Sequence, residues 1–188
     1  IALRKAEKWM LDHMEKYGGL GAMWLAIVNS IFDMKCLGYP DDHPVLANQL
    51  REMENLMIYD GDKLYLQPCV SPVWDTAWAI IALHESGMPG ADSSLQKAGQ
   101  WLLSKEVRHY GDWALKCKVD EPSGWYFQYA NEFYPDTDDS AAVLMALQRV
   151  SLPERMHKEK AVLRGLKWLL AMQCDDGGWG AFDMNNNR

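Results

Sequence analysis

The chain has 188 residues, enough for a domain with its own hydrophobic core, and carries a net charge of −7. The acidic balance and the lack of a basic patch argue against a nucleic-acid partner. Four cysteines and five histidines stand at no zinc-ligand spacing, so we expect reduced, packed thiols and no structural metal.

Helical periodicity dominates the chain, and the predicted helices are of two kinds. Amphipathic helices with charged faces are predicted over residues 2–16, 44–57, 92–105 and 157–172. Helices that are apolar nearly all round are predicted over residues 22–32, 76–83 and 141–147. A helix apolar on every face needs burial on every face. Residues 63–66 are at most a short extended piece.

The two kinds of helix alternate along the chain, and glycine and proline separate them. This alternation predicts an all-α fold with an outer and an inner layer, part of an α/α toroid, or double-layer α/α barrel. We interpret residues 1–188 as a single partial domain of such a barrel, cut from a longer chain. An incomplete barrel leaves apolar helices uncovered, so we expect the fragment alone to be inactive.

An internal repeat supports this architecture. A basic residue, a small residue, two others, an aromatic and an aliphatic residue recur from Lys5, Lys97 and Arg164. We expect glycine-containing turns that end at Leu20, Trp113 and Trp179 to close the three copies. The full Gln-x-x-x-Gly-x-Trp form occurs only at residues 173–179. There we expect the Gln173 amide to cap one helix while Trp179 packs on the next.

Three carboxylates, Asp136, Asp138 and Asp139, precede the apolar helix predicted over residues 141–147. One aspartate would be enough to cap that helix, so three need another explanation. Close carboxylates cannot all ionise cheaply, and a carboxyl that keeps its proton beside an apolar cavity is a candidate acid for an alkene. Capping and a cation site remain alternatives, although the order Asp-x-Asp-Asp lacks a second set of magnesium ligands.

These motifs together resemble one family along the whole chain. The repeat is similar to the QW motif of triterpene cyclases. Residues 134–139, Tyr-Pro-Asp-Thr-Asp-Asp, resemble the acid motif of bacterial squalene–hopene cyclases. Residues 71–76, 124–128 and 177–183 are similar to family segments in the same order. Oxidosqualene cyclases have a different local acid motif, and diterpene cyclases are not expected to have these flanking segments.

The resemblance implies a role for each aspartate. Asp138 would deliver the proton to the terminal double bond of a polyene. Asp136 would tune that acid through a histidine on a later segment that this chain lacks. Asp139 would help to hold the site and to stabilise the first cation.

The resemblance also implies a cavity wall. Phe127 would face an early cation, and Trp74 would line the cavity and bind the polyene, whereas simple core packing is the alternative for both. Phe182 stands where the family often has tyrosine, so its ring lacks a hydroxyl. Met23 begins a stretch that usually contains proline beside the cavity, which leaves the product and its ring stereochemistry open.

The implied activity is cyclisation of squalene to hopene or hopanol without a metal, nucleotide or redox cofactor. Squalene is insoluble in water, so the resemblance implies a monotopic enzyme on the cytoplasmic side of a bacterial membrane, and it leaves open a homodimer. A class II cyclase of a prenyl diphosphate is the first alternative and would need a basic pocket. A non-catalytic α/α toroid that binds a partner is the second, and its aspartates would be exposed and unpaired.

Overall fold

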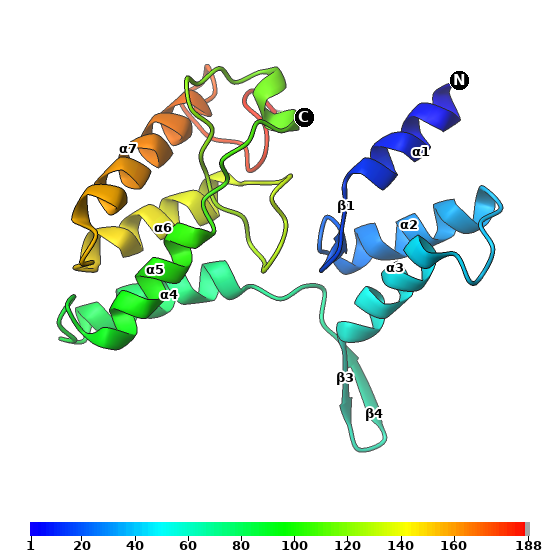
Figure 1. Cartoon of the computed structure of the whole chain (residues 1–188), viewed down its shortest axis with the longest axis horizontal. Helices are drawn as coiled ribbons and strands as arrows, with labels where there is room; N and C mark the ends of the chain where they lie inside the picture. Colours follow the sequence, from blue (N-terminus) through cyan, green and yellow to red (C-terminus); the bar gives the residue numbers. More distant parts are fainter. Residues whose placement is uncertain (187–188) are drawn as a thin grey trace. The chain divides into compact units, whose positions relative to one another are not determined.

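A computed structural model describes residues 1–186, which form two compact units (Figure 1). Unit 1 comprises Ile1–Val70 and Gln128–Asn131. Unit 2 comprises Ser71–Phe127 and the residues from Glu132 onward. Each unit is described by itself.

Unit 1 contains three helices and two small antiparallel hairpins. The helices are α1 (Ala2–Asp12), α2 (Trp24–Cys36) and α3 (Pro44–Asn55). The hairpins pair β1 (Met14–Glu15) with β2 (Gly19–Leu20), and β3 (Met57–Asp60) with β4 (Lys63–Leu66). Helices α2 and α3 pack against each other, and a small core gathers around Met10, Met34 and Leu46.

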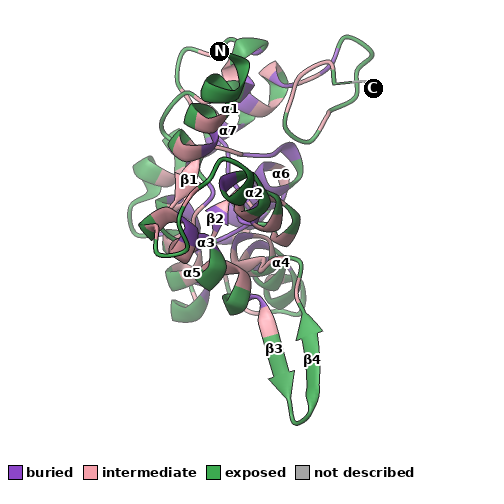
Figure 2. Cartoon of the chain, turned by 90° about the vertical axis from the view of Figure 1, so that its right-hand side faces the viewer, coloured by how far each residue is buried: buried purple, intermediate pink, exposed green. Residues whose placement is uncertain are grey.

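The β3–β4 hairpin corrects the expectation of a helix to residue 57 and little extended structure. Asp60 pairs with Lys63 across a tight turn in which Gly61 has a φ of +61°. The two turn residues are Gly61 and Asp62, and glycine is typical of the first position of such turns, because it adopts positive φ without a steric cost. Strand β4 is exposed at every residue, as its green colour in Figure 2 shows. Its side chains therefore lack the alternation of buried and exposed positions that would have predicted a strand.

Unit 2 has four α-helices among its described residues. They are α4 (Pro72–Glu85), α5 (Ser93–Ser104), α6 (Thr137–Arg149) and α7 (Arg155–Ala171), and a short 3-10 helix, η1, spans Asp112–Leu115. Helix α6 packs against α4, α5 and α7, and Figure 2 shows it largely buried. The main core surrounds it and includes Val73, Leu102, Trp125 and Leu147.

The predominance of helices agrees with part of an α/α toroid. Of the helices predicted to be apolar nearly all round, only α6 is largely buried, and its Met145 is still exposed. Phe32 on α2 is 61% exposed, and Trp78 and Leu83 on α4 are exposed as well. This exposure agrees with the expectation that part of a barrel leaves apolar helices uncovered. Within each unit, α2 and α4 find packing partners over only part of their surface, so one apolar side of each helix faces solvent.

Two further findings concern the cysteines, which were expected to be packed, and the helix lengths. All four cysteines are free, but Cys36 is exposed and not packed. Among residues 1–186, no helix is both long enough and apolar enough to cross a bilayer.

Candidate active site

The aspartate motif forms the first turn of α6. Asp136 is the N-cap in extended conformation, and its side chain accepts a hydrogen bond from the Asp139 backbone N–H at 2.7 Å. This is the usual way for an aspartate to satisfy a free N–H group at a helix start. The capping alternative therefore describes Asp136 correctly, but it accounts for only one of the three carboxylates.

The three carboxylates differ in burial. Asp136 is 5% exposed and Asp139 is 2% exposed, whereas Asp138 is exposed to solvent. One oxygen of Asp139, Oδ1, is buried without a hydrogen-bond partner among the described residues. Buried polar atoms are rarely left in this state, and they often belong to sites that a proton or another group completes.

Burial makes two of these carboxyls weaker acids than an ordinary aspartate. Burial, a side-chain hydrogen bond with Asp139 and the negative charges of Asp139 and Asp138 together raise the pKa of Asp136 to about 10, although the bond from the Asp139 backbone N–H opposes the shift. Burial and the charge of Asp138 raise the pKa of Asp139 to about 6, although the hydrogen bond between the Asp139 and Asp136 side chains opposes the shift. Asp136 therefore keeps a proton at neutral pH, while Asp139 is mostly ionised.

The backbone of Trp125 holds Asp136 in place. The Asp136 N–H donates to the Trp125 carbonyl at 2.9 Å, and the Trp125 N–H donates to the Ser140 hydroxyl at 2.8 Å. The Trp125 ring is fully buried beneath α7, where a Cβ at Gly165 would lie 2.8 Å from it. The small residue of the repeat thus makes room for this ring. Sequence reasoning missed Trp125 and Ser140 as supports of the site, although Ser140 directly follows the motif.

Phe127 and Trp74 form an aromatic pair in the same unit. The Val73 N–H donates to the Phe127 carbonyl at 3.3 Å, which joins the start of α4 to the segment that contains Trp125. The rings of Trp74 and Phe127 lie 6.4 Å apart, and Trp78 stands edge-on to Trp74 at 5.6 Å. Both predicted aromatics are half-buried, so each ring keeps an accessible surface.

Phe182 belongs to a loop that reaches the acid motif, whereas Met23 belongs to unit 1. Thr137 donates from its N–H to the Ala181 carbonyl at 3.0 Å and from its hydroxyl to the Gly180 carbonyl at 3.1 Å. These bonds bring the backbone beside Phe182 to the first turn of α6, and the Phe182 ring is half exposed. Met23 is the exposed N-cap of α2 and is described only within its own unit.

Two cavities in the described part of the chain lie apart from the aspartates. One, of about 290 Å³, lies in unit 1 and is lined by residues that include Glu52 and Gln128. The other, of about 550 Å³, is an open groove beside α7 in unit 2. Neither is lined by a motif aspartate, so the predicted cavity beside the acid stays a prediction. Among the described residues, no group of three or more His, Cys, Asp or Glu side chains has the geometry of a metal site.

The closing turn of the third repeat corrects the role expected for its glutamine. The Gln173 side-chain amide donates to the Gly177 carbonyl at 2.8 Å, inside the turn itself. The Trp179 indole N–H donates to the Leu169 carbonyl at 2.7 Å, in the last turn of α7. The tryptophan therefore caps the helix and the glutamine closes the turn, because only the indole reaches one of the free carbonyls at the helix end.

The second repeat is closed by Trp125 and not, as expected, by Trp113. The Trp125 indole donates to the Leu102 carbonyl at 2.7 Å, and Leu102 holds the same place in its repeat as Leu169 holds in the third. Trp113 instead packs edge-on against Trp168, with ring centroids 5.8 Å apart. A longer loop before the closing turn hides this equivalence in the sequence.

Comparisons with known proteins identify the family of the chain. The family model described as "Squalene-hopene cyclase C-terminal domain" matches residues 70–188, and the one described as "Squalene-hopene cyclase N-terminal domain" matches residues 1–62. Squalene–hopene cyclase of Zymomonas mobilis is 40% identical over 99% of this chain and 30% of its own length. Dammaradiene synthase of Dryopteris crassirhizoma is 42% identical over 99% of this chain and 27% of its own length.

A third relative is squalene–hopene cyclase of Alicyclobacillus acidocaldarius, which is 36% identical over 97% of this chain and 29% of its own length. The chain thus spans about 30% or less of the length of these three relatives. The matches run from one end of the chain to the other and include both family domains. The chain belongs to the squalene–hopene cyclase family of triterpene cyclases.

Proposed function

We propose that this chain supplies the acid and part of the cavity wall of an enzyme that cyclises squalene to hopene or hopanol. The observation that supports this most directly is the buried pair of Asp136 and Asp139 at the start of α6, where burial keeps a proton on a carboxyl at neutral pH. Protonation of an alkene needs a carboxyl that still carries its proton, and the proposal assigns the delivery to Asp138, which stands beside this pair in the sequence. Relatives named squalene–hopene cyclase match the chain at about 40% identity or slightly less.

In the proposed mechanism Asp138 delivers the proton, while Asp136 and Asp139 support it. Asp138 lies between the two buried carboxyls in sequence, and its charge contributes to raising the pKa of both. Asp138 is exposed in this chain, so the proposal requires the rest of the full-length protein to exclude water from it. Water would otherwise trap the first cation and end the reaction early.

The aromatic residues stabilise the positive charge in this proposal. Phe127 and Trp74 present π faces from neighbouring segments, and Phe182 adds a ring without a hydroxyl. Cation–π attraction is strongest where water is excluded. Met23 would form part of the wall in the full-length enzyme. No step of this mechanism uses a metal, nucleotide or redox cofactor.

Another triterpene product is the second candidate, because dammaradiene synthase is as similar to this chain as the squalene–hopene cyclases are. The full-length enzyme would take squalene from a bilayer as a peripheral or monotopic protein on the cytoplasmic side of a bacterial membrane. The insolubility of squalene in water supports that location. A homodimer and the absence of a nucleic-acid partner complete the proposal.

The test is Asp138→Asn in the full-length protein that contains this sequence. The amide has the same shape but cannot donate an acidic proton, so squalene turnover should fall by about 100-fold or more. Gas chromatography of the products measures this change and also distinguishes hopene from dammarane-type products. Asp120→Asn is the control, since Asp120 is an exposed aspartate of the same unit. Near-normal turnover by Asp138→Asn would rule out Asp138 as the acid.

A further inference from the structure

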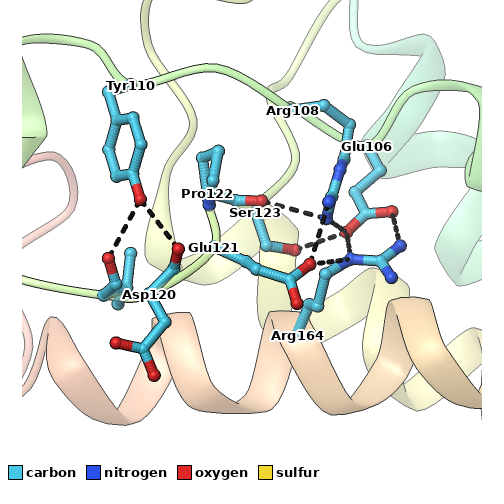
Figure 3. A network of polar contacts seen from close by, with 9 residues as sticks. Glu106, Arg108, Tyr110, Asp120, Glu121, Pro122, Ser123 and Arg164 are labelled. Carbon is cyan, nitrogen blue, oxygen red and sulfur yellow. Dashed lines mark hydrogen bonds and ion pairs between the residues drawn. The ribbon is translucent and has the colours of Figure 1, made fainter.

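Glu106, just after α5, has a buried carboxylate with four hydrogen bonds (Figure 3). Its side chain is 4% exposed. Arg164 of α7 donates to both carboxylate oxygens, at 2.6 and 2.9 Å, and Arg108 donates at 3.2 Å. The Ser123 hydroxyl donates the fourth bond at 2.8 Å. A buried charge is tolerated only when paired in this way, so the cluster joins α5, α7 and the loop before Trp125.

Glu106 occupies the place in the second repeat that Gln173 occupies in the third. Gln173 binds the residue two positions before its closing tryptophan, Gly177, and Glu106 binds the residue two positions before Trp125, Ser123. The backbone follows the same pattern, because the residue after each donates from its N–H to the residue before each tryptophan, at 2.9 Å for Val107–Gly124 and 2.8 Å for Cys174–Gly178.

The two turns differ in what they must hold. Residues 107–122 separate Glu106 from Ser123, whereas only three residues separate Gln173 from Gly177. A longer loop loses more conformational entropy on closing, so a stronger anchor is needed. The two arginines provide it with charge-assisted bonds. The loop is tied further by Tyr110, whose hydroxyl donates to the carbonyls of Val119 and Asp120, as Figure 3 shows.

The segment held by Glu106 leads directly to the acid. Ser123 is two residues before Trp125, whose carbonyl accepts the Asp136 N–H and whose own N–H donates to Ser140. Phe127 follows two residues later on the same segment. A shift of Ser123 therefore moves the backbone on which both Asp136 and Phe127 depend.

We propose that Glu106 is a positioning residue for the acid of the cyclisation reaction, acting through the Ser123 hydroxyl and the Trp125 backbone on Asp136. The inference rests on the function proposed above. The carboxylate itself touches neither substrate nor acid. Its effect is to keep Asp136 buried beside Asp139 and Asp138, and so to keep its proton in place.

The experiment is Ser123→Ala in the full-length protein, because this change removes only the bond between Glu106 and the segment and leaves the pairing with Arg164 intact. We expect kcat with squalene to fall by about 3- to 10-fold, equivalent to one hydrogen bond, with KM unchanged. We also expect activity to be lost at a lower pH than in the wild type, because a less buried Asp136 has a lower pKa. The assay temperature is kept well below the melting temperature of both proteins.

A double-mutant cycle with Glu106→Ala identifies the path. Once Glu106 is replaced, Ser123→Ala should reduce kcat no further, because the two residues act through one bond. Glu159→Gln, in the exposed Arg155–Glu159 pair on the same helix as Arg164, is the control and should leave kcat and the pH profile unchanged.

The possible results separate the two proposals. An active wild type, with Ser123→Ala equal to it in kcat and pH profile, would overturn the positioning role and leave the proposed function standing. A wild type that forms no product from squalene would overturn the proposed function and the positioning role with it.

Discussion

Unit 2 buries carboxylates at two places, and their surroundings are opposite. Glu106 is surrounded by donors, of which Arg164 and Arg108 carry positive charge. Asp136 and Asp139 have no arginine, lysine or histidine among the causes of their pKa shifts, and their neighbours there are each other and Asp138. The arginines around Glu106 neutralise its negative charge, whereas the surroundings of Asp136 and Asp139 make a negative charge there unfavourable.

The difference shows how one domain assigns different tasks to the same functional group. A buried carboxylate that is paired with a guanidinium is held in one geometry and serves structure. Buried carboxyls that have only each other keep a proton, which makes them candidates for acid chemistry. Sequence alone shows only aspartates and glutamates, because the distinction depends on which side chains surround them.

Arg164→Ala should have the largest effect on stability, because it leaves the Glu106 charge buried without its main partner. We expect the 188-residue chain to lose about 3 to 5 kcal/mol of unfolding free energy, measured by urea denaturation with circular dichroism. Arg155→Ala is the matched control, since its partner Glu159 lies on the surface and the pair is worth at most about 1 kcal/mol. Equal effects of the two changes would show that the Glu106 charge is not effectively buried.

Isosteric amides at the two places should act in opposite directions. Glu106→Gln removes a charged partner of Arg164 and should cost about 1.5 to 3 kcal/mol at pH 7. Asp136→Asn replaces a carboxyl that is already neutral at pH 7, and its oxygen can still accept from the Asp139 N–H. We therefore expect Asp136→Asn to leave the urea midpoint unchanged or to raise it. A large loss in Asp136→Asn would mean that Asp136 is ionised in the folded state.

The pH dependence of the unfolding free energy should reveal the raised pKa values of Asp136 and Asp139. Their folded pKa values, about 10 for Asp136 and about 6 for Asp139, lie above the ordinary value of 3.8. The folded chain then binds more protons than the unfolded chain, so their contribution is fully present below about pH 4 and is lost as the pH rises. Relative to Asp136→Asn, the wild type should become less stable between pH 6 and pH 9 in the same urea assay. A wild type that gains stability over this range would contradict the assignment.

Gln173→Ala should have the smallest effect, because Gln173 closes a short, exposed turn with one neutral hydrogen bond. We expect a loss of about 1 kcal/mol or less. Glu106→Gln in the equivalent place of the second repeat should cost more than this. A loss for Gln173→Ala as large as that for Glu106→Gln would remove the distinction between the two turns.

Much of the architecture could be predicted from periodicity and from the repeat. The predicted helix over residues 92–105 is within one residue of α5 at each end, because Asp92 is an N-cap that accepts from the Ser94 N–H. The turns that close the first and third repeats lie where they were expected, and Met14 pairs with Leu20 as Gln173 pairs with Trp179, but in the third repeat Trp179 and not Gln173 caps the helix. The hairpin of β3 and β4 was missed, because exposed strands leave no burial pattern in the sequence.

The candidate site was predicted in its residues but not in its contacts. Asp136, Asp138 and Asp139 stand out because three carboxylates before an apolar helix are unusual. Their unequal burial was not predictable, since it depends on how α6 packs against α4 and α7. Trp125 was overlooked as a closing tryptophan because its partner residue, Glu106, is charged and stands far from it in sequence.

The sequence by itself determined the helical fold class, the positions of most helices and the presence of the acid motif, because helix periodicity, caps and motif spacing are local properties of the chain. Only the tertiary structure decided which tryptophan closes the second repeat, which carboxyl keeps its proton and which carboxylate is paired. Those outcomes arise from residues brought together across long loops and between helices. The charge state of a buried group follows from such neighbours and from the exclusion of water, neither of which is encoded in the residue's own position in the sequence.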